Sequence, residues 1–242
     1  MILMVTELGI KRENEILRIL KLFKGLNLIV VGGYAVDAYT VHRFSVDLDI
    51  VIKKEDLRKF EKTLVKEGYS LETSKKGFDT TYSGEFRRYM KDVGGKVDMD
   101  LLIESLVSRT TNASWSFDFL KKNSSKRLIK GFTENVEAFV LSKEMLIAAK
   151  LHSGRVTDLR DITMLNIDLE QEKILSLLSR GDMRIVANII NRFIEHLNDK
   201  NFIDSLKGVF SISGLVRKPD LAEIQIKKTL RLLEFLKNKI IK

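Results

Sequence analysis

The sequence is poor in the residues that bind soft metals and cross-link chains. It has no cysteine and only three histidines, His42, His152 and His196. The chain therefore forms no disulfide and no thiolate metal site, and the scattered histidines argue against a histidine-bound zinc. Any metal that this protein binds must be held by oxygen atoms, which favours magnesium or manganese.

Long apolar runs are also absent from the sequence. No stretch reaches the roughly 18 to 20 apolar residues of a membrane span, and the apolar run over 1–5 is too short for a secretory signal. We therefore expect a cytoplasmic protein with no membrane partner. Its 242 residues, 44% apolar and 31% charged, suffice for a globular core. A net charge of +9 raises the prospect of a polyanionic partner.

The most informative stretch covers residues 28–52. Residues 28–31 form a short apolar, β-branched run that is typical of a buried strand. Gly32 and Gly33 follow, where a backbone without side chains can turn and approach a bulky anion. The apolar spacing over 34–41 predicts about two helical turns, so the glycines stand between a strand and a helix N-terminus. We expect this corner to seat an anion.

A second strand is predicted over 46–52, and it carries Asp47 and Asp49. Side chains alternate between the two faces of a strand, so these aspartates point the same way while their apolar neighbours point to the other face. Their Cα atoms would lie roughly 6 to 7 Å apart. Neighbouring carboxylates resist joint ionisation, and a divalent cation would relieve their repulsion.

These residues together resemble a known signature. The similarity is to the polymerase-β-like nucleotidyltransferase superfamily, and it rests on Gly32-Gly33 followed by Arg43-Phe44-Ser45-Val46-Asp47-Leu48-Asp49. The wider form, G-G-x-A-(x)-Y-(x)-R-x-S-x-D-h-D, most resembles the AbiEii type, the toxin half of a class of toxin–antitoxin pairs. By this resemblance the two aspartates would hold metal ions and the two glycines would hold a triphosphate. Arg43 and Ser45 would shape the turn or contact phosphate.

A third carboxylate comes from a predicted hairpin, whose strands cover 86–90 and 96–103. On its second strand Asp98 and Asp100 share one face. The superfamily has a third aspartate on a neighbouring antiparallel strand, where it activates the incoming hydroxyl and helps to bind one metal. Either Asp98 or Asp100 fits that role, and the pattern of basic and apolar neighbours favours Asp98. The other aspartate would cap or form a salt bridge at the sheet edge.

A second match follows this core, where a helix over 143–152 precedes a helix capped by Thr157. The K-(x)-R-(x)-D-(x)-D motif of AbiEii-type proteins is matched by Lys150, Arg155, Asp158 and Asp161. In that family the lysine binds the nucleotide phosphates and the acidic residues position it. The alternative is an ordinary ion pair between arginine and aspartate on a helix face, which contributes little to stability.

The remaining pattern sets the expected architecture. It predicts helices over 13–24 and 53–66, a long polar loop or irregular strand over 70–84, a strand over 136–141 and helices from 169 onward. We expect an α/β (α+β) fold of the nucleotidyltransferase type, with a mixed sheet flanked by helices and a C-terminal helical bundle. The expected domains are a nucleotidyltransferase core over 1–140 and a helical C-terminal region over 141–242, packed against the core.

Two further features lie in the last part of the expected core. Trp115, Phe117 and Phe119 are interpreted as core side chains rather than as a platform for base stacking. A basic cluster near them is interpreted as a solvated face, with an RNA contact as the alternative. The cluster consists of Lys121, Lys122, Lys126, Arg127 and Lys130.

The sequence thus predicts a metal-dependent nucleotidyltransferase with Mg²⁺ or Mn²⁺ as cofactor. It would move a nucleoside monophosphate from a nucleoside triphosphate to a hydroxyl group. The favoured acceptor is the end of an RNA such as tRNA, and a toxin-like role would add an antitoxin protein as partner. Two alternatives stay open: transfer to a protein or small-molecule hydroxyl, and a non-catalytic protein that only binds a nucleotide or a partner. The convergent aspartates argue against the second, and the basic charge leans towards RNA.

Overall fold

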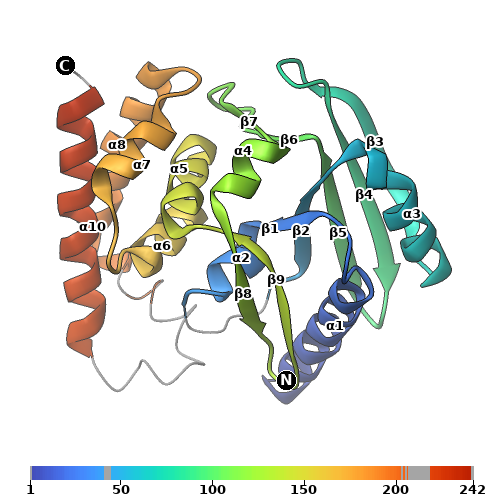
Figure 1. Ribbon diagram of the computed structural model, residues 1–242. Helices are drawn as coiled ribbons and strands as arrows, with labels where there is room; N and C mark the ends of the chain where they lie inside the picture. Colours follow the sequence, from blue (N-terminus) through green and yellow to red (C-terminus); the bar gives the residue numbers. More distant parts are fainter. Residues whose placement is uncertain (1, 41–44, 203, 205, 207–218, 241–242) are drawn as a thin grey trace. The chain divides into compact units, whose positions relative to one another are not determined.

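The computed structural model describes residues 2–40, 45–202, 204, 206 and 219–240 (Figure 1). The predicted site residue Arg43 lies outside the described residues. The chain forms two compact units. The first unit consists of Met1–Ala38, Phe44–Val107 and Ser114–Ser142, and the second of Tyr39–Arg43, Ser108–Ala113 and Lys143–Lys242.

A seven-stranded sheet forms the centre of the first unit, in the order β3-β4-β5-β2-β1-β9-β8 (Figure 1). Its strands are β1 (Leu28–Val31), β2 (Asp47–Ile52), β3 (Ser70–Asp79), β4 (Gly84–Asp92), β5 (Lys96–Ile103), β8 (Ser124–Lys130) and β9 (Asn135–Leu141). β1 pairs in parallel with β9 and β2 pairs in parallel with β5, whereas the other neighbours are antiparallel. The sheet is therefore mixed, as predicted.

Helices flank this sheet, which confirms the predicted α/β class. The other elements of the first unit are α1 (Ile2–Leu22), α2 (Gly32–Asp37), the 3-10 helix η1 (Lys54–Asp56), α3 (Leu57–Lys66), α4 (Phe117–Lys122) and a separate strand pair, β6 (Ser105–Val107) and β7 (Ser114–Ser116). Phe23, just after α1, meets Phe60 of α3 edge to face at 4.7 Å. The alternate residues Leu48, Ile50 and Ile52 of β2 are at most 1% exposed. This burial leaves the aspartates of β2 on the other face.

The second unit is mainly helical. It contains α5 (Lys143–Ser153), α6 (Val156–Leu165), α7 (Gln171–Leu178), α8 (Met183–Leu197) and α10 (Pro219–Ile240). α5 packs against α6, α7 and α8, and α10 packs against α8. The predicted C-terminal helices are thus confirmed. Among the described residues, no helix is both long enough and apolar enough to cross a membrane.

Some predicted boundaries were wrong. α1 begins at Ile2 rather than at residue 13, and α2 ends at Asp37 instead of continuing to residue 41. The N-cap of α6 is Arg155 rather than Thr157, because the Asp158 carboxylate accepts the Arg155 backbone N–H at 3.2 Å. The polar region over 70–84 is largely the irregular strand β3, which has two register shifts against β4.

The direction of β5 also differs from the family-based expectation. It runs parallel to β2, not antiparallel. Between the two strands the chain passes through α3 and the β3–β4 hairpin, and a crossover of this length can return a strand in the same direction. Because β5 runs parallel to β2, its two aspartates lie level with those of β2.

The aromatic and basic residues before β9 are split between interior and surface. Trp115 and Phe117 are buried, as predicted, whereas Phe119 is only half-buried. Lys121 lies against the Phe139 ring, and the rest of the basic cluster is exposed. The interpretation of the cluster as a largely solvated face agrees with these exposures.

Candidate active site

Acidic residues from two separate segments share one face of the sheet. In the parallel pair β2–β5, Asp47 lies directly opposite Asp98, and Asp49 lies opposite Asp100. Residues paired in this way point to the same face of a sheet. Asp47, Asp49 and Asp98 are half-buried, and Asp100 is buried. The register therefore places all four carboxylates on one face, close to the end of β1 where the glycines lie.

Asp100 forms a two-point ion pair with Arg88 on the neighbouring strand β4. Arg88 Nε donates to Oδ1 and Arg88 Nη2 donates to Oδ2, both at 2.7 Å. Burial, aided by the charges of Asp47 and Asp98, raises the pKa of the Asp100 carboxyl above its ordinary value, although Arg88 opposes the shift. Of the two aspartates predicted on β5, Asp100 is thus the one that forms the salt bridge.

The Asp98 carboxylate, unlike that of Asp100, has a buried oxygen atom without a hydrogen-bond donor among the described residues. Its Oδ1 atom is buried and accepts no hydrogen bond from any residue that the structure describes. A buried carboxylate oxygen without a donor is unfavourable unless a cation or a proton compensates for it. This geometry favours Asp98 over Asp100 as the third acidic residue of the candidate site.

The glycine corner closes against Asp49. Gly32, at the start of α2, has a φ of +65°, a left-handed conformation that residues with side chains disfavour. A β-carbon at this position would lie 2.1 Å from Asp49 Oδ2, far inside contact distance. Gly33 follows in the first turn of α2. Glycine at position 32 therefore allows the Asp49 carboxylate to occupy the corner.

Two hydrogen bonds orient the first aspartate. The buried Tyr34 hydroxyl donates to the carbonyl oxygen of Ser45 at 3.1 Å, and Ser45 Oγ donates to Asp47 Oδ1, also at 3.1 Å. The sequence pattern singled out Ser45, but it assigned no role to Tyr34 or to Arg88. The only signals were a tyrosine directly after two glycines and a basic residue on a strand next to the aspartates, and both signals are common.

The donor set of this face suits magnesium or manganese, because its candidate ligands are all carboxylate oxygens. Within the described residues, no three acidic or histidine side chains lie close enough together to form a complete metal site. Mg²⁺, however, is usually held by one or two carboxylates together with waters and substrate phosphates. The buried Asp98 oxygen, which accepts no hydrogen bond from the described residues, fits a cation that binds together with a nucleotide.

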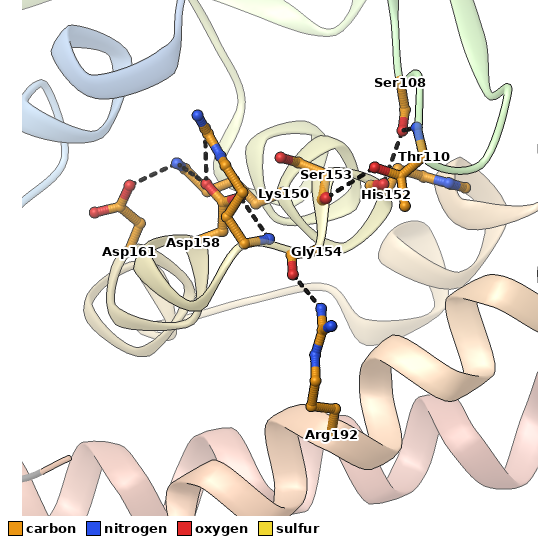
Figure 2. Close-up of polar contacts among 10 residues, drawn as sticks. Ser108, Thr110, Lys150, His152, Ser153, Gly154, Asp158, Asp161 and Arg192 are labelled. Carbon is orange, nitrogen blue, oxygen red and sulfur yellow. Dashed lines mark hydrogen bonds and ion pairs between the residues drawn. The ribbon is translucent and has the colours of Figure 1, made fainter. Parts of the chain in front are cut away.

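A second group of charged side chains lies in the second unit (Figure 2). Lys150 Nζ on α5 donates to Asp161 Oδ2 at 2.5 Å and to Asp158 Oδ1 at 3.2 Å, and both aspartates are on α6. Arg155 donates to the Asp158 carboxylate through its guanidinium. Burial tends to raise the pKa of Asp158, but Lys150 and Arg155 hold it below its ordinary value. The structure thus brings together all four residues of the second motif, and the lysine side chain is only 8% exposed.

The segment Ser108–Ala113 is tied to the end of α5 by hydrogen bonds (Figure 2). Ser108 Oγ donates to the carbonyl oxygen of His152 at 2.7 Å, and Thr111 Oγ1 lies 2.7 Å from His152 Nδ1. His152 Nε2 lies 3.2 Å from the carbonyl oxygen of Leu178, so Nε2 carries the proton and donates it. Burial lowers the pKa of His152 to about 4. His152 is therefore a neutral structural residue at pH 7.

Comparisons with known proteins show distant structural similarity. A provisionally named nucleotidyltransferase from H. pylori is 18% identical, with 97% of this chain and 96% of that chain covered and a TM-score of 0.48. JHP933 from Helicobacter pylori is 18% identical, with 97% and 94% covered and a TM-score of 0.47. The lincosamide antibiotic adenylyltransferase LnuA, solved with lincomycin bound, is 20% identical, with 63% and 95% covered and a TM-score of 0.44. No protein-family model and no curated protein matches the chain. Because these similarities are distant, the function of this chain has to be inferred from its own residues.

Proposed function

We propose that this protein is a metal-dependent nucleotidyltransferase, which moves a nucleoside monophosphate from a nucleoside triphosphate to a hydroxyl group. The observation that carries the proposal is the pairing of Asp47 with Asp98 on one sheet face, with a buried Asp98 oxygen that no described residue satisfies. Asp49 adds a further carboxylate at the glycine corner. A protein that only binds a nucleotide has no need of three carboxylates on one face, because they repel the phosphates.

In this proposal Asp47, Asp49 and Asp98 would hold Mg²⁺ or Mn²⁺. When bound, the divalent ions would neutralise charge on the triphosphate and make the acceptor hydroxyl more acidic. Ser45 keeps the Asp47 carboxylate in its orientation through the 3.1 Å hydrogen bond. Asp100 takes no part, because Arg88 occupies both of its oxygens.

The chain's own groups then serve positioning and proton transfer. The backbone N–H groups of Gly32 and Gly33 would bind phosphate oxygens, since neither residue has a side chain that could shield them. The acceptor oxygen forms a bond to the α-phosphorus while the bond from that phosphorus to the bridging oxygen breaks and pyrophosphate leaves. Asp98 accepts the proton of the acceptor hydroxyl. The family resemblance would add Lys150 as a phosphate-binding residue that Asp158 and Asp161 hold in place.

The favoured acceptor is the end of an RNA, with tRNA as the leading candidate. The net charge of +9 supports a polyanionic partner. A toxin-like role in the cytoplasm, with an antitoxin protein encoded as a separate chain, belongs to the same proposal and rests on the resemblance of the signature alone. Transfer to a protein or small-molecule hydroxyl is the second candidate, because the same carboxylates would serve any hydroxyl.

Radiolabel transfer tests the proposal. The protein would be incubated with Mg²⁺ and each nucleoside triphosphate labelled at the α-phosphate, together with total RNA or total protein. We expect label in RNA, and we expect Asp47→Asn to abolish it. Asp118→Asn serves as the matched control, because this aspartate of α4 has a side chain that is 73% exposed. Full incorporation by Asp47→Asn would refute the assignment, and no label in any fraction would favour a binding protein.

A further inference from the structure

The face of the sheet that carries the aspartates continues onto β4 and β3. Arg88 of β4 lies opposite Asp100 of β5. Two residues earlier on β4, Phe86 lies opposite Leu102. On its other side Phe86 lies opposite Lys75 of β3. Because paired residues share a face, Phe86 stands on the carboxylate side of the sheet with a cation on each side of it.

A break in the register of β3 brings a second aromatic ring to this place. Lys75 pairs with Phe86, and the pairing shifts before Asp79. Gly77 lies within the shift and has a φ of +63°. Strict alternation would turn Phe78 away from the face that Lys75 occupies, yet its ring stacks on Phe86 with centroids 5.4 Å apart and planes at 29°.

The other face of β4 is already occupied. There Arg87 and the Tyr89 hydroxyl both contact the Glu61 carboxylate of α3. Phe78 and Phe86, in contrast, are half-buried, and Lys75 is exposed. We name Phe78, Phe86, Lys75 and Arg88 the aromatic shelf. The shelf is thus a partly open surface rather than a piece of the core.

The composition of the aromatic shelf suits one kind of ligand. Binding of single-stranded nucleic acid combines aromatic rings, on which bases stack, with cations that follow the phosphates. Lys75 and the neighbouring Lys76 form no ion pair with any described residue. The Arg88 guanidinium lies 5.9 Å from the centre of the Phe86 ring. The surface therefore combines two aromatic rings with two lysines that are unpaired among the described residues and with Arg88, whose charge is shared with Asp100.

The position of the shelf relative to the aspartates indicates which substrate it serves. Across the sheet the order is glycine corner on β1, carboxylates on β2 and β5, then the shelf on β4 and β3. A nucleotide at the glycine corner leaves the opposite side of the carboxylates to the acceptor. Phe86 pairs four residues along β5 from Asp98, so their Cα atoms lie about 14 Å apart. A single strand whose last hydroxyl meets Asp98 can reach the shelf with an earlier base.

We propose that the aromatic shelf binds the bases of a single-stranded RNA acceptor and directs its terminal hydroxyl to Asp98. The inference rests on the proposed function and specifies its acceptor. It separates a base-stacking role for Phe78 and Phe86 from the role of Trp115 and Phe117, which are buried in the core.

Fluorescence anisotropy with a short labelled single-stranded RNA, without nucleotide or metal, tests the inference. Loss of one stacking ring in Phe86→Ala or Phe78→Ala should raise the dissociation constant roughly 5- to 150-fold. Phe86→Tyr should retain binding, because it keeps the ring. Phe132→Ala is the matched control, since this ring is 60% exposed in the turn before β9, and it should bind like the wild type. The same RNA annealed into a duplex should bind more weakly and should not respond to Phe86→Ala.

The outcomes distinguish the proposed RNA binding by the aromatic shelf from the proposed nucleotidyl transfer. If single-stranded RNA binds Phe86→Leu and Phe78→Leu, which keep apolar volume without a ring, as tightly as the wild type, the shelf does not stack bases. Failure of the wild type to prefer single strands over duplex would overturn the inference as well. Label transfer only to protein would refute the RNA shelf and leave the nucleotidyltransferase proposal intact. Support for both requires that Asp47→Asn binds the RNA normally yet transfers no label.

Discussion

The Asp49 carboxylate occupies the space that a side chain at Gly32 would need, because a β-carbon on the glycine would lie 2.1 Å from Oδ2 of the aspartate. Gly25 provides the contrast. Its φ of +91° is also left-handed, yet apart from its two chain neighbours no described residue has an atom within 4 Å of the place where its β-carbon would be. The two glycines therefore share the conformational requirement but differ in the steric one.

Gly25→Ala should lower the free energy of unfolding by about 1 kcal/mol, because an alanine tolerates the left-handed region poorly. Gly32→Ala should cost about 2 to 4 kcal/mol and also reduce nucleotidyl transfer, because Asp49 must move away. Urea unfolding of both variants measures the difference. Equal destabilisation of the two would show that the Asp49 carboxylate simply swings aside.

Asp98 and Asp100 should respond in opposite ways to the same change. Asp98→Asn removes a charge whose buried oxygen has no donor among the described residues, so stability should be unchanged or higher while transfer falls about 100-fold or more. Asp100→Asn weakens the pair with Arg88, so unfolding should become easier by about 1 to 3 kcal/mol. Thermal unfolding and label transfer on both variants check this. A larger loss of transfer in Asp100→Asn would reverse the assignment.

The sequence could predict strands with a regular apolar pattern, because β1 is a continuous apolar run and β5 alternates apolar residues with two aspartates before an apolar end. β1 and β5 have the bounds expected for them. The prediction for β3 left a loop and a strand open, because β3 is an edge strand with mostly exposed polar side chains. Its pairing with β4 owes little to side-chain burial. A pattern of side chains carries little information about such a strand.

The candidate site was predictable in its residue types but not in its pairing. Alternation on β5 placed both aspartates on one face, yet the choice between them depends on the register of β4, which puts Arg88 opposite Asp100. That register is set across the β4–β5 turn, and side-chain periodicity does not encode it. The hydrogen bond from Tyr34 to Ser45 likewise joins residues whose distance in space depends on how α2 meets β2.

His152 should make the stability of the protein depend on pH. Burial lowers the pKa of the folded histidine to about 4 from its ordinary 6.5. Below the ordinary value the unfolded chain binds a proton that the folded chain does not, so stability falls as the pH falls and levels off near the folded pKa. The loss should be about 2 kcal/mol between roughly pH 7 and pH 5. Unfolding curves at both pH values should show a smaller loss in His152→Gln, and an equal loss in that variant would contradict the prediction.

Lys150 forms ion pairs with two buried carboxylates, so its removal should affect stability before anything else. Lys150→Met leaves Asp158 and Asp161 without their shared cation and should cost about 3 to 5 kcal/mol. Arg155→Ala is the milder comparison. Its side chain is 70% exposed, so screening by water limits the loss to about 1 kcal/mol or less.

A double change separates this structural role from a role in nucleotide binding. Lys150→Met combined with Asp161→Asn removes one unpaired charge and should recover part of the stability. If the lysine also binds phosphates, as the resemblance implies, KM for the nucleoside triphosphate should stay raised about 10-fold or more, because a charge-assisted hydrogen bond is lost. Denaturant unfolding and initial rates on the same samples provide both quantities. Recovery of KM together with stability would mean that Lys150 only holds α5 to α6, and that the phosphates depend on the glycine corner and the bound cation alone.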